Sequence, residues 1–320
     1  MQNEAEGTIL HLQRLSTEDG PGLRTTVFFK GCPLHCAWCH NPESISPQPQ
    51  VQWLENRCIG CGSCLKACPQ GALHRNSDGL VRDRAICQVC GACVEACPAN
   101  AQEMLGQRIS SGALVKELLK DRAYYEKSGG GVTLSGGEPS LQAGFALALL
   151  NALHAKGVST ALDTCGLCSR ETLAQLAEAS DLILYDVKAI EPQAHRRFTG
   201  ANNERILENL CWLGGYLAQH PGKRLWVRTP LIPGATASQE NLAATSAWLA
   251  ENLGGRVERW ELCAFNNLCR DKYRRLEIAW DFNQTTLMSR AEMAQAAEWA
   301  RSAGFAPERI FVTGAARVEN

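Results

Sequence analysis

The sequence lacks the features of a membrane, secreted or nucleic-acid-binding protein. No apolar run reaches the roughly 20 residues that span a bilayer, and the opening MQNEAEGTIL carries acidic side chains where a secretory leader would be basic and then apolar. The 32 basic and 33 acidic residues leave a net charge of −1, which offers no attraction for nucleic acid or for an anionic membrane. We therefore expect a cytoplasmic protein with neither partner.

Cysteine, by contrast, is abundant. The chain has 16 cysteines in 320 residues. Because the cytoplasm keeps thiols reduced, clustered cysteines there indicate metal ligands rather than disulfides. Three lie close together at Cys32, Cys36 and Cys39, and eight lie between Cys58 and Cys97. The remaining five are scattered: Cys165, Cys168, Cys211, Cys263 and Cys269.

The group of eight cysteines is an internal repeat. CIGCGSCLKACP begins at Cys58, CQVCGACVEACP begins at Cys87, and each reads C-x2-C-x2-C-x3-C-P. Bacterial ferredoxins with two [4Fe–4S] clusters have this spacing, and the fourth cysteine of each run ligates the other cluster. Structural zinc sites use two separated pairs of ligands instead, so we prefer iron–sulfur clusters. The predicted first set is Cys58, Cys61, Cys64 and Cys97, and the second set is Cys68, Cys87, Cys90 and Cys93.

The group of three cysteines predicts a different kind of centre. A [4Fe–4S] cluster held by Cys32, Cys36 and Cys39 would keep one iron open, and an open coordination position is the mark of a catalytic metal site. Trp38 lies between two of these ligands, where it could cover the cluster with apolar surface or serve as a core residue. The sequence thus predicts two closed clusters for electron transfer and one open cluster for chemistry.

Six ordered motifs carry a resemblance to a known family. The stretch STEDGPGLRTTVFFKGCPLHCAWCHNPES (16–44), with TLSGGEP, DTCG, DVK, HRRFTGANN and RTPLIPG, resembles the activating enzymes of glycyl radical enzymes in the radical S-adenosylmethionine (SAM) superfamily. The ferredoxin-like repeat is typical of the branch with extra clusters. Two departures occur: DTCG replaces the family's D-T-N-G or E-T-x-G, and Asn266 stands where the family often has a histidine.

The resemblance implies an activity. SAM would bind the open iron and be cleaved with an electron from a flavodoxin or ferredoxin. The resulting 5′-deoxyadenosyl radical would take hydrogen from a backbone glycine of a partner glycyl radical enzyme. The protein itself would supply positioning and the exclusion of water and oxygen in an anaerobic setting, because the cofactor supplies the difficult chemistry.

The resemblance also implies a set of SAM-binding residues. Gly136 and Gly137 would meet the methionine end of SAM, Glu138 its ammonium, and Lys188 its carboxylate. A surface role remains an alternative for Lys188. The oxygens of Asp163, Thr164 and Asp186 would suit a monovalent cation or the polar edge of SAM. The other expected contacts are Trp38, His40, Asn41, His195, Asn203 and Arg228, of which His195 would equally suit a surface helix.

The pattern along the chain predicts an α/β fold. Apolar strand-like runs occur at 24–31, 131–135, 158–163, 181–188, 224–231, 257–265 and 309–314, and helical apolar spacing occurs at 141–157, 170–179, 203–220, 239–255 and 289–304. We favour a partial (β/α)6 barrel over a doubly wound open sheet, because the candidate motifs follow strands, as active sites do in barrels. The barrel would comprise 1–51 and 105–320, interrupted by a ferredoxin-like insert at 52–104.

Three alternative functions remain open from the sequence. A non-catalytic electron carrier would explain the repeat but not SGGEP or the three-cysteine motif. A radical SAM enzyme acting on a small metabolite would not explain DGPGLRTTVFF. An activator of an anaerobic ribonucleotide reductase would normally lack the insert.

Overall fold

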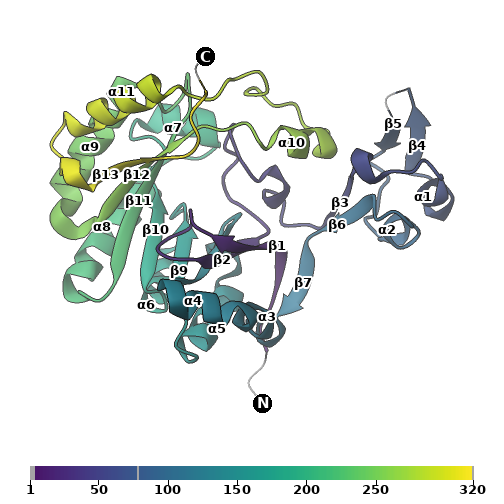
Figure 1. Ribbon diagram of the computed structural model, residues 1–320, viewed down its shortest axis with the longest axis horizontal. Helices are drawn as coiled ribbons and strands as arrows, with labels where there is room; N and C mark the ends of the chain where they lie inside the picture. The colour runs from purple at the N-terminus through teal and green to yellow at the C-terminus, as the bar shows by residue number, and fades with distance from the viewer. Residues whose placement is uncertain (1–3, 78, 319–320) are drawn as a thin grey trace.

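A computed structural model describes residues 4–77 and 79–318. Its main body is a nine-stranded sheet in the order β13-β12-β11-β10-β9-β8-β2-β1-β7 (Figure 1). The strands are β1 (Glu6–Ser16), β2 (Arg24–Phe29), β7 (Gln107–Ser110), β8 (Gly131–Gly136), β9 (Ser159–Thr164), β10 (Leu182–Asp186), β11 (Arg224–Leu231), β12 (Arg259–Ala264) and β13 (Ile310–Thr313).

The strands from β2 to β13 in this order are all parallel. β2 pairs with β8, and β8 to β13 then follow in chain order. β1 pairs antiparallel with β2 on one side and with β7 on the other, so β7 is the strand at this margin of the sheet. In the described residues the order begins at β13 and ends at β7 without returning. The sheet is therefore an open, curved barrel (Figure 1), and the predicted partial α/β barrel with its seven strand segments is confirmed.

Helices connect the parallel strands and cover the outside of the sheet (Figure 1), as parallel crossovers require. Four begin at serine caps, Ser110, Ser169, Ser238 and Ser289, whose side chains each accept a backbone N–H of the first turn. The helices are α3 (Ser111–Leu118), α4 (Arg122–Ser128), α5 (Ala143–His154), α6 (Arg170–Glu178), α7 (Pro192–Thr199), α8 (Glu204–Gln219), α9 (Gln239–Leu253), α10 (Arg270–Leu276) and α11 (Arg290–Arg301).

The insert stands apart from the barrel on a two-stranded stem (Figure 1). β3 (Gln50–Trp53) and β6 (Gln102–Leu105) pair antiparallel, with Gln50 opposite Leu105. Between them lie α1 (Ser63–Ala67), β4 (Leu73–Asn76), β5 (Gly79–Arg82) and α2 (Ala92–Glu95). The stem extends past both expected boundaries of the insert, 52 and 104, which stay a prediction.

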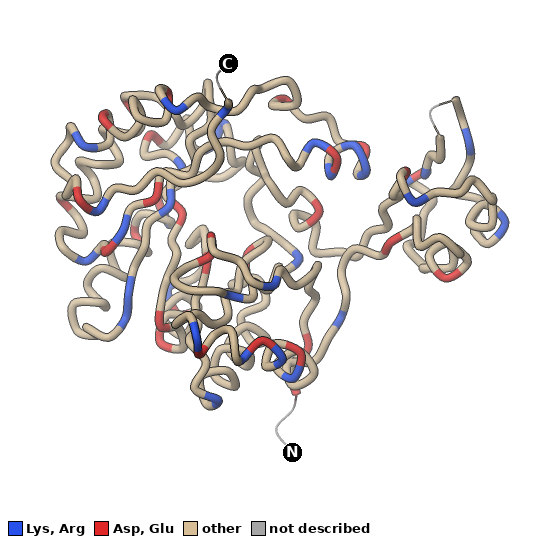
Figure 2. Tube along the Cα trace, in the orientation of Figure 1, with Lys and Arg blue, Asp and Glu red and all other residues tan. Residues whose placement is uncertain are grey.

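The insert also contacts the barrel at α10. Arg84 Nε lies 3.1 Å from Glu277 Oε2, and Arg84 Nη2 donates to Arg275 O at 3.4 Å. Arg274 and Glu55 approach to 3.8 Å. Basic and acidic residues are interspersed along the chain in both regions (Figure 2).

The described part of the chain offers no membrane-crossing helix, since none is both long and apolar enough. The longest helix described, α8, has 16 residues.

Candidate active site and cluster sites

Cys32, Cys36 and Cys39 lie on one loop that follows β2. Two backbone hydrogen bonds close this loop at its base, from Gly31 N to Ser44 O at 2.7 Å and from Cys32 N to Ile45 O at 3.0 Å. We call residues 31–45 the cluster loop. Its closure brings the three thiols to the carboxyl ends of the barrel strands, where barrel active sites lie.

Side chains from the segment around α10 hold the cluster loop from outside. Tyr273 Oη donates to Cys39 O at 2.9 Å, and Trp280 Nε1 donates to Ala37 O at 2.9 Å. The two aromatic rings stack with centroids 4.8 Å apart. These bonds satisfy carbonyl groups that the irregular loop cannot pair internally, and a buried carbonyl without a partner is costly.

Lys272 adds three polar contacts to the same loop. Its Nζ lies 2.7 Å from Asn41 Oδ1, 3.1 Å from His40 O and 2.7 Å from Glu43 Oε1. His40 in turn contacts Asn266 Oδ1 through Nε2. Asn266, which replaces the family's histidine, therefore meets the residue next to Cys39.

The end of α7 holds the opposite side of the cluster loop. His35 N donates to Thr199 O at 2.8 Å, and Ala37 N donates to Phe198 O at 2.9 Å. Trp38 is 8% exposed and lies with its ring centroid 5.9 Å from that of Phe198. Trp38 also lines the adjoining cavity, so it is at once a core residue and a wall of the site.

A cavity of about 320 Å³ opens beside the three cysteines at the strand ends. Thirteen of the predicted residues line it: Cys32, Cys36, Trp38, Cys39, His40, Asn41, Gly136, Gly137, Asp163, Thr164, Asp186, Lys188 and Arg228. Motifs that are far apart in the sequence thus converge on one space, as the predicted active site requires.

The two glycines of this wall have a packing role that the sequence analysis did not anticipate. Gly136 has φ +102°, and a Cβ there would lie 2.4 Å from Phe29 N. A Cβ on Gly137 would lie 2.2 Å from Gly31 O. Neither position has room for a side chain, because the backbone passes directly against the end of β2 and the start of the cluster loop.

A charged network forms the polar wall of the cavity. Arg228 lies 3.6 Å from Asp163 and 3.0 Å from Glu261, and Ser135 Oγ donates to Asp163 at 2.6 Å. Burial raises the pKa of Asp163 to about 7, against the opposing effect of Arg228. The network therefore places the carboxyl group of Asp163 at the strand ends, where its charge depends on the neighbouring groups.

Lys188 and Asp186 form a second charged pair in this wall. Lys188 Nζ lies 2.5 Å from Asp186 Oδ2, and the lysine side chain is 10% exposed. Burial lowers the pKa of Lys188, but Asp186 and Cys36 outweigh that effect and hold the pKa well above its ordinary value. The positive form of this largely buried lysine is therefore favoured, and it faces the cavity.

Three predicted contacts are absent from the cavity wall. Glu138 is 1% exposed and accepts hydrogen bonds from Thr164 Oγ1 and Cys165 N, both at 2.8 Å. Buried His195 contacts Ala201 O at 2.7 Å, and buried Asn203 donates to Ile190 O at 2.8 Å. All three brace the loops behind the site, and their contacts with SAM stay predictions.

Several lining residues escaped the sequence analysis. They include Ser135, Cys165, Cys263, Phe265 and Asn266. Cys165 is buried and also lines the cavity. Each lies at or next to the carboxyl end of a strand, and this position was the available signal.

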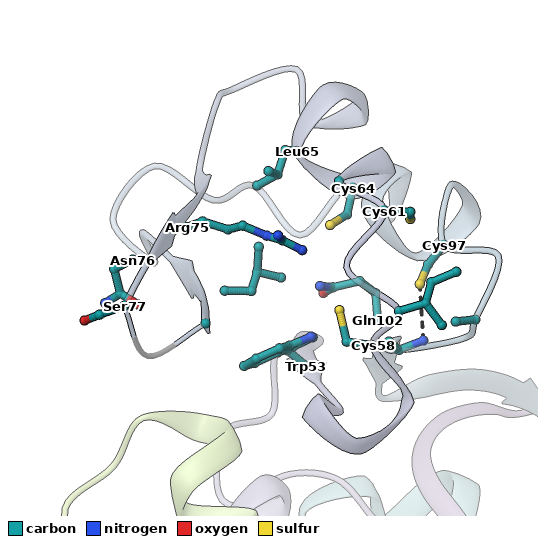
Figure 3. Close-up of a pocket in the computed structure, with 16 residues that line it drawn as sticks. Trp53, Cys58, Cys61, Cys64, Leu65, Arg75, Asn76, Ser77, Cys97 and Gln102 are labelled. Carbon is teal, nitrogen blue, oxygen red and sulfur yellow. Dashed lines mark hydrogen bonds between the residues drawn. The ribbon is translucent and has the colours of Figure 1, made fainter.

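The first set of insert cysteines surrounds a separate cavity. Cys58, Cys61, Cys64 and Cys97 all line it (Figure 3), although Cys97 comes from the other half of the repeat. The sulfur atoms of Cys58 and Cys64 and the amide of Gln102 point toward one central space. The four cysteines that the repeat groups crosswise thus line one cavity, while their role as cluster ligands stays a prediction.

The donor chemistry of both sets fits iron–sulfur clusters. Backbone N–H groups donate to sulfur from Ala101 to Cys97 at 3.2 Å and from Ala72 to Cys68 at 3.3 Å, and such bonds accompany thiolate ligands of these clusters. A left-handed glycine, Gly62 or Gly91, precedes each of α1 and α2. Within residues 4–77 and 79–318, no group of three or more Cys, His, Asp or Glu is spaced for a single metal ion.

Comparisons with known proteins agree with this geometry. Residues 87–245 match the radical SAM superfamily, 57–101 a 4Fe–4S dicluster domain and 18–68 a 4Fe–4S single-cluster domain. The fold resembles a radical SAM methyltransferase from Sphaerobacter thermophilus, with a TM-score of 0.52 and 15% identity over 96% of this chain and 73% of that one.

Curated relatives are more similar in sequence. The trans-4-hydroxy-L-proline dehydratase activating enzyme of Clostridioides difficile is 42% identical over 84% of this chain and 87% of its own. The choline trimethylamine-lyase activating enzyme of Oleidesulfovibrio alaskensis is 39% identical over 87% and 89%. The pyruvate formate-lyase 2-activating enzyme of Escherichia coli is 36% identical over 92% and 90%.

These matches show that the protein is a radical SAM enzyme with ferredoxin-type cluster domains. The chain belongs to the activating enzymes of glycyl radical enzymes. The comparisons support this function over the electron-carrier and small-metabolite alternatives.

Proposed function

We propose that this protein activates its partner at the cavity beside Cys32, Cys36 and Cys39. These three thiolates would hold the open [4Fe–4S] cluster, and SAM would occupy the adjoining space. The observation that carries the proposal is the convergence of all three thiols, both charged pairs and the glycine wall on one cavity. When bound, the cluster and SAM together supply reductive cleavage and a 5′-deoxyadenosyl radical.

The residues of the chain would orient and shield SAM. Lys188 is the buried cation suited to the carboxylate of its methionine end, and Asp186, now paired with Lys188, is suited to the ammonium. Trp38 and Phe265 add apolar walls, which exclude water from the reacting groups. Asp163 and Asp186 each already face a protein cation, so the expected monovalent cation stays a prediction.

The insert would deliver electrons. We infer a total of three [4Fe–4S] clusters, two held by the insert and one by the cluster loop, with a flavodoxin or ferredoxin as donor. Support comes from the dicluster match over 57–101, which spans all eight insert cysteines. Anaerobically reconstituted protein should then contain about twelve iron atoms per chain.

The partner would be a glycyl radical enzyme that presents its glycine loop to the open side of the barrel. The named relatives activate enzymes of chemically different substrates, so the partner's own substrate is left to experiment. A panel of glycyl radical enzymes, including any encoded next to this protein, is the suitable set of partners.

Electron paramagnetic resonance (EPR) tests the proposal directly. The protein, SAM, a one-electron reductant and each candidate partner are mixed without oxygen. One partner should develop a glycyl doublet that requires SAM and disappears when its loop glycine is changed to alanine. Deoxyadenosine formed together with a modified small molecule, and without a radical on any partner, would contradict the proposal.

A further inference from the structure

A buried arginine distinguishes the second set of insert cysteines from the first. Arg82, the last residue of β5, is 8% exposed. Its Nη1 lies 3.6 Å from the Sγ of Cys87 and 3.7 Å from the Sγ of Cys93. Both sulfurs belong to the predicted second set, so one guanidinium group donates to two ligands of the same cluster.

Gln102 holds the other side of this guanidinium. Arg82 Nη2 donates to Gln102 Oε1 at 2.5 Å, and Gln102 is 3% exposed. The amide of Gln102 also lines the cavity of the first set (Figure 3). None of the three described hydrogen bonds of Arg82 goes to a carboxylate, so its positive charge is directed at the cluster site.

The first set has an arginine of a different kind. Arg75 points into the cavity formed by Cys58, Cys61, Cys64 and Cys97 (Figure 3), but its side chain is exposed. Water and salt screen an exposed charge, whereas a buried charge keeps most of its field. Two cysteines of the first set, Cys58 and Cys61, are exposed as well. In the second set only Cys90 is exposed, and Cys93 is buried.

Reduction of a [4Fe–4S] cluster adds one electron without breaking a bond. The added negative charge is stabilised by a nearby positive charge and by hydrogen bonds to sulfur, both of which raise the reduction potential. Burial acts in the opposite direction, since it penalises the added charge. Arg82 supplies both the positive charge and the hydrogen bonds to sulfur at the more buried site. Its removal should therefore lower the reduction potential of that cluster, because the cost of burying the added charge is no longer offset.

We propose that Arg82 raises the potential of the cluster held by Cys68, Cys87, Cys90 and Cys93, so that this cluster is the first in the insert to accept an electron. The electron comes from a reduced donor of the ferredoxin or flavodoxin type, and the oxidised cluster takes it up. The proposal rests on the proposed two-cluster insert. Arg82 is a tuning residue that acts on the ligands and not on SAM.

Redox titration of the full chain tests this role. The background carries Cys32→Ala, Cys36→Ala and Cys39→Ala, so all remaining clusters belong to the insert. Reduced clusters are followed by EPR while the potential is set with dithionite and mediators. Adding Cys61→Ser to the background removes the signal of the first-set cluster. The reduction step that disappears, called a wave below, then belongs to the first set, and the one that remains belongs to the second.

Arg82→Gln keeps a hydrogen-bond donor but removes the charge. It should lower the potential of the second-set wave by at least the equivalent of a tenfold loss in the equilibrium constant for reduction, about 59 mV for one electron. The first-set wave should move much less. Arg82→Lys should keep most of the original potential. Arg75→Gln is the matched control at the exposed site. It should change the equilibrium constant for reduction of the first-set cluster by about twofold or less.

Three outcomes would overturn the role of Arg82: an unmoved second-set wave in Arg82→Gln, equal shifts of both waves, or an Arg82→Lys shift as large as that of Arg82→Gln. If Arg82→Gln loses iron, Gln102→Leu provides a second test. It keeps the charge but frees the guanidinium, and should give a smaller shift of the same sign; no shift there would count against the proposal.

Iron content separates this proposal from the one on which it rests. The triple-alanine background should hold about eight iron atoms per chain. About four would contradict the two-cluster insert itself, whatever the Arg82 variants show. Eight iron atoms with unchanged potentials would overturn only the role of Arg82.

Discussion

The cluster loop and the insert present cysteine thiols in opposite ways. In the insert, short helical turns and local N–H groups direct the sulfurs, as with Ala101 and Cys97 only four residues apart. In the cluster loop, side chains more than 230 positions away supply the support, as with Tyr273 and Cys39. The insert therefore builds its sites locally, whereas the catalytic site depends on the complete barrel.

The largest expected effect comes from cysteine variants that exploit this separation. Cys36→Ala should abolish SAM cleavage, because it removes a ligand of the open cluster. Cys61→Ala should remove about four of the expected twelve iron atoms and leave SAM binding intact. Deoxyadenosine formation, iron content and SAM binding are measured on each. Loss of SAM binding in folded Cys61→Ala protein would contradict the separation of the two regions. It would mean that the cluster that binds SAM has been assigned wrongly.

A smaller effect is expected from the long-range support. Lys272→Met removes three polar contacts of the cluster loop and leaves the buried Glu43 carboxylate without its cation. An unsatisfied buried group costs about 1–3 kcal/mol, so iron should leave this cluster faster in the presence of a chelator, while the insert clusters stay unchanged.

Arg274→Met is the matched control for Lys272→Met. Arg274 lies on the same helix as Lys272, but its side chain is 69% exposed and pairs with Asp271. Iron release from Arg274→Met should therefore match that of the unmodified protein. Faster release from the insert clusters in Lys272→Met would mean that the two regions are not independent.

The smallest effect is expected where the two regions touch. Arg84→Ala removes an ion pair with Glu277 whose side chains are 36% and 43% exposed. Such pairs contribute about 0–1 kcal/mol, so thermal unfolding, iron content and SAM affinity should barely change. A drop of several degrees in the unfolding temperature would show that the insert depends on α10 as well as on its stem.

The same contrast explains what could be predicted from the sequence. The grouping of the insert cysteines follows from spacing alone, and Cys58, Cys61, Cys64 and Cys97 do line one cavity. The parallel strands follow from apolar runs, since strands buried on both faces read as continuous hydrophobic stretches. Strand β1 was not among the predicted strands, because its buried and exposed residues alternate near its start and most of its later residues are exposed.

The residues around the active site could be predicted only in part. Lys188 follows β10, Arg228 lies within β11, and both line the cavity as predicted. Nothing local shows that Trp280 reaches Ala37, 243 positions away, or that the oxygens of Glu138 are already occupied by Thr164 and Cys165. Such contacts depend on the curvature of the sheet, which a linear pattern does not contain.

The stem of the insert has a consequence for how such proteins change over time. Because Gln50 pairs with Leu105, the chain leaves the barrel and returns to it at the same place. A short turn joining these two residues would close the gap without altering the order of the barrel strands. The insert could thus be removed or replaced as one continuous segment, while the path of the chain through the barrel stays the same.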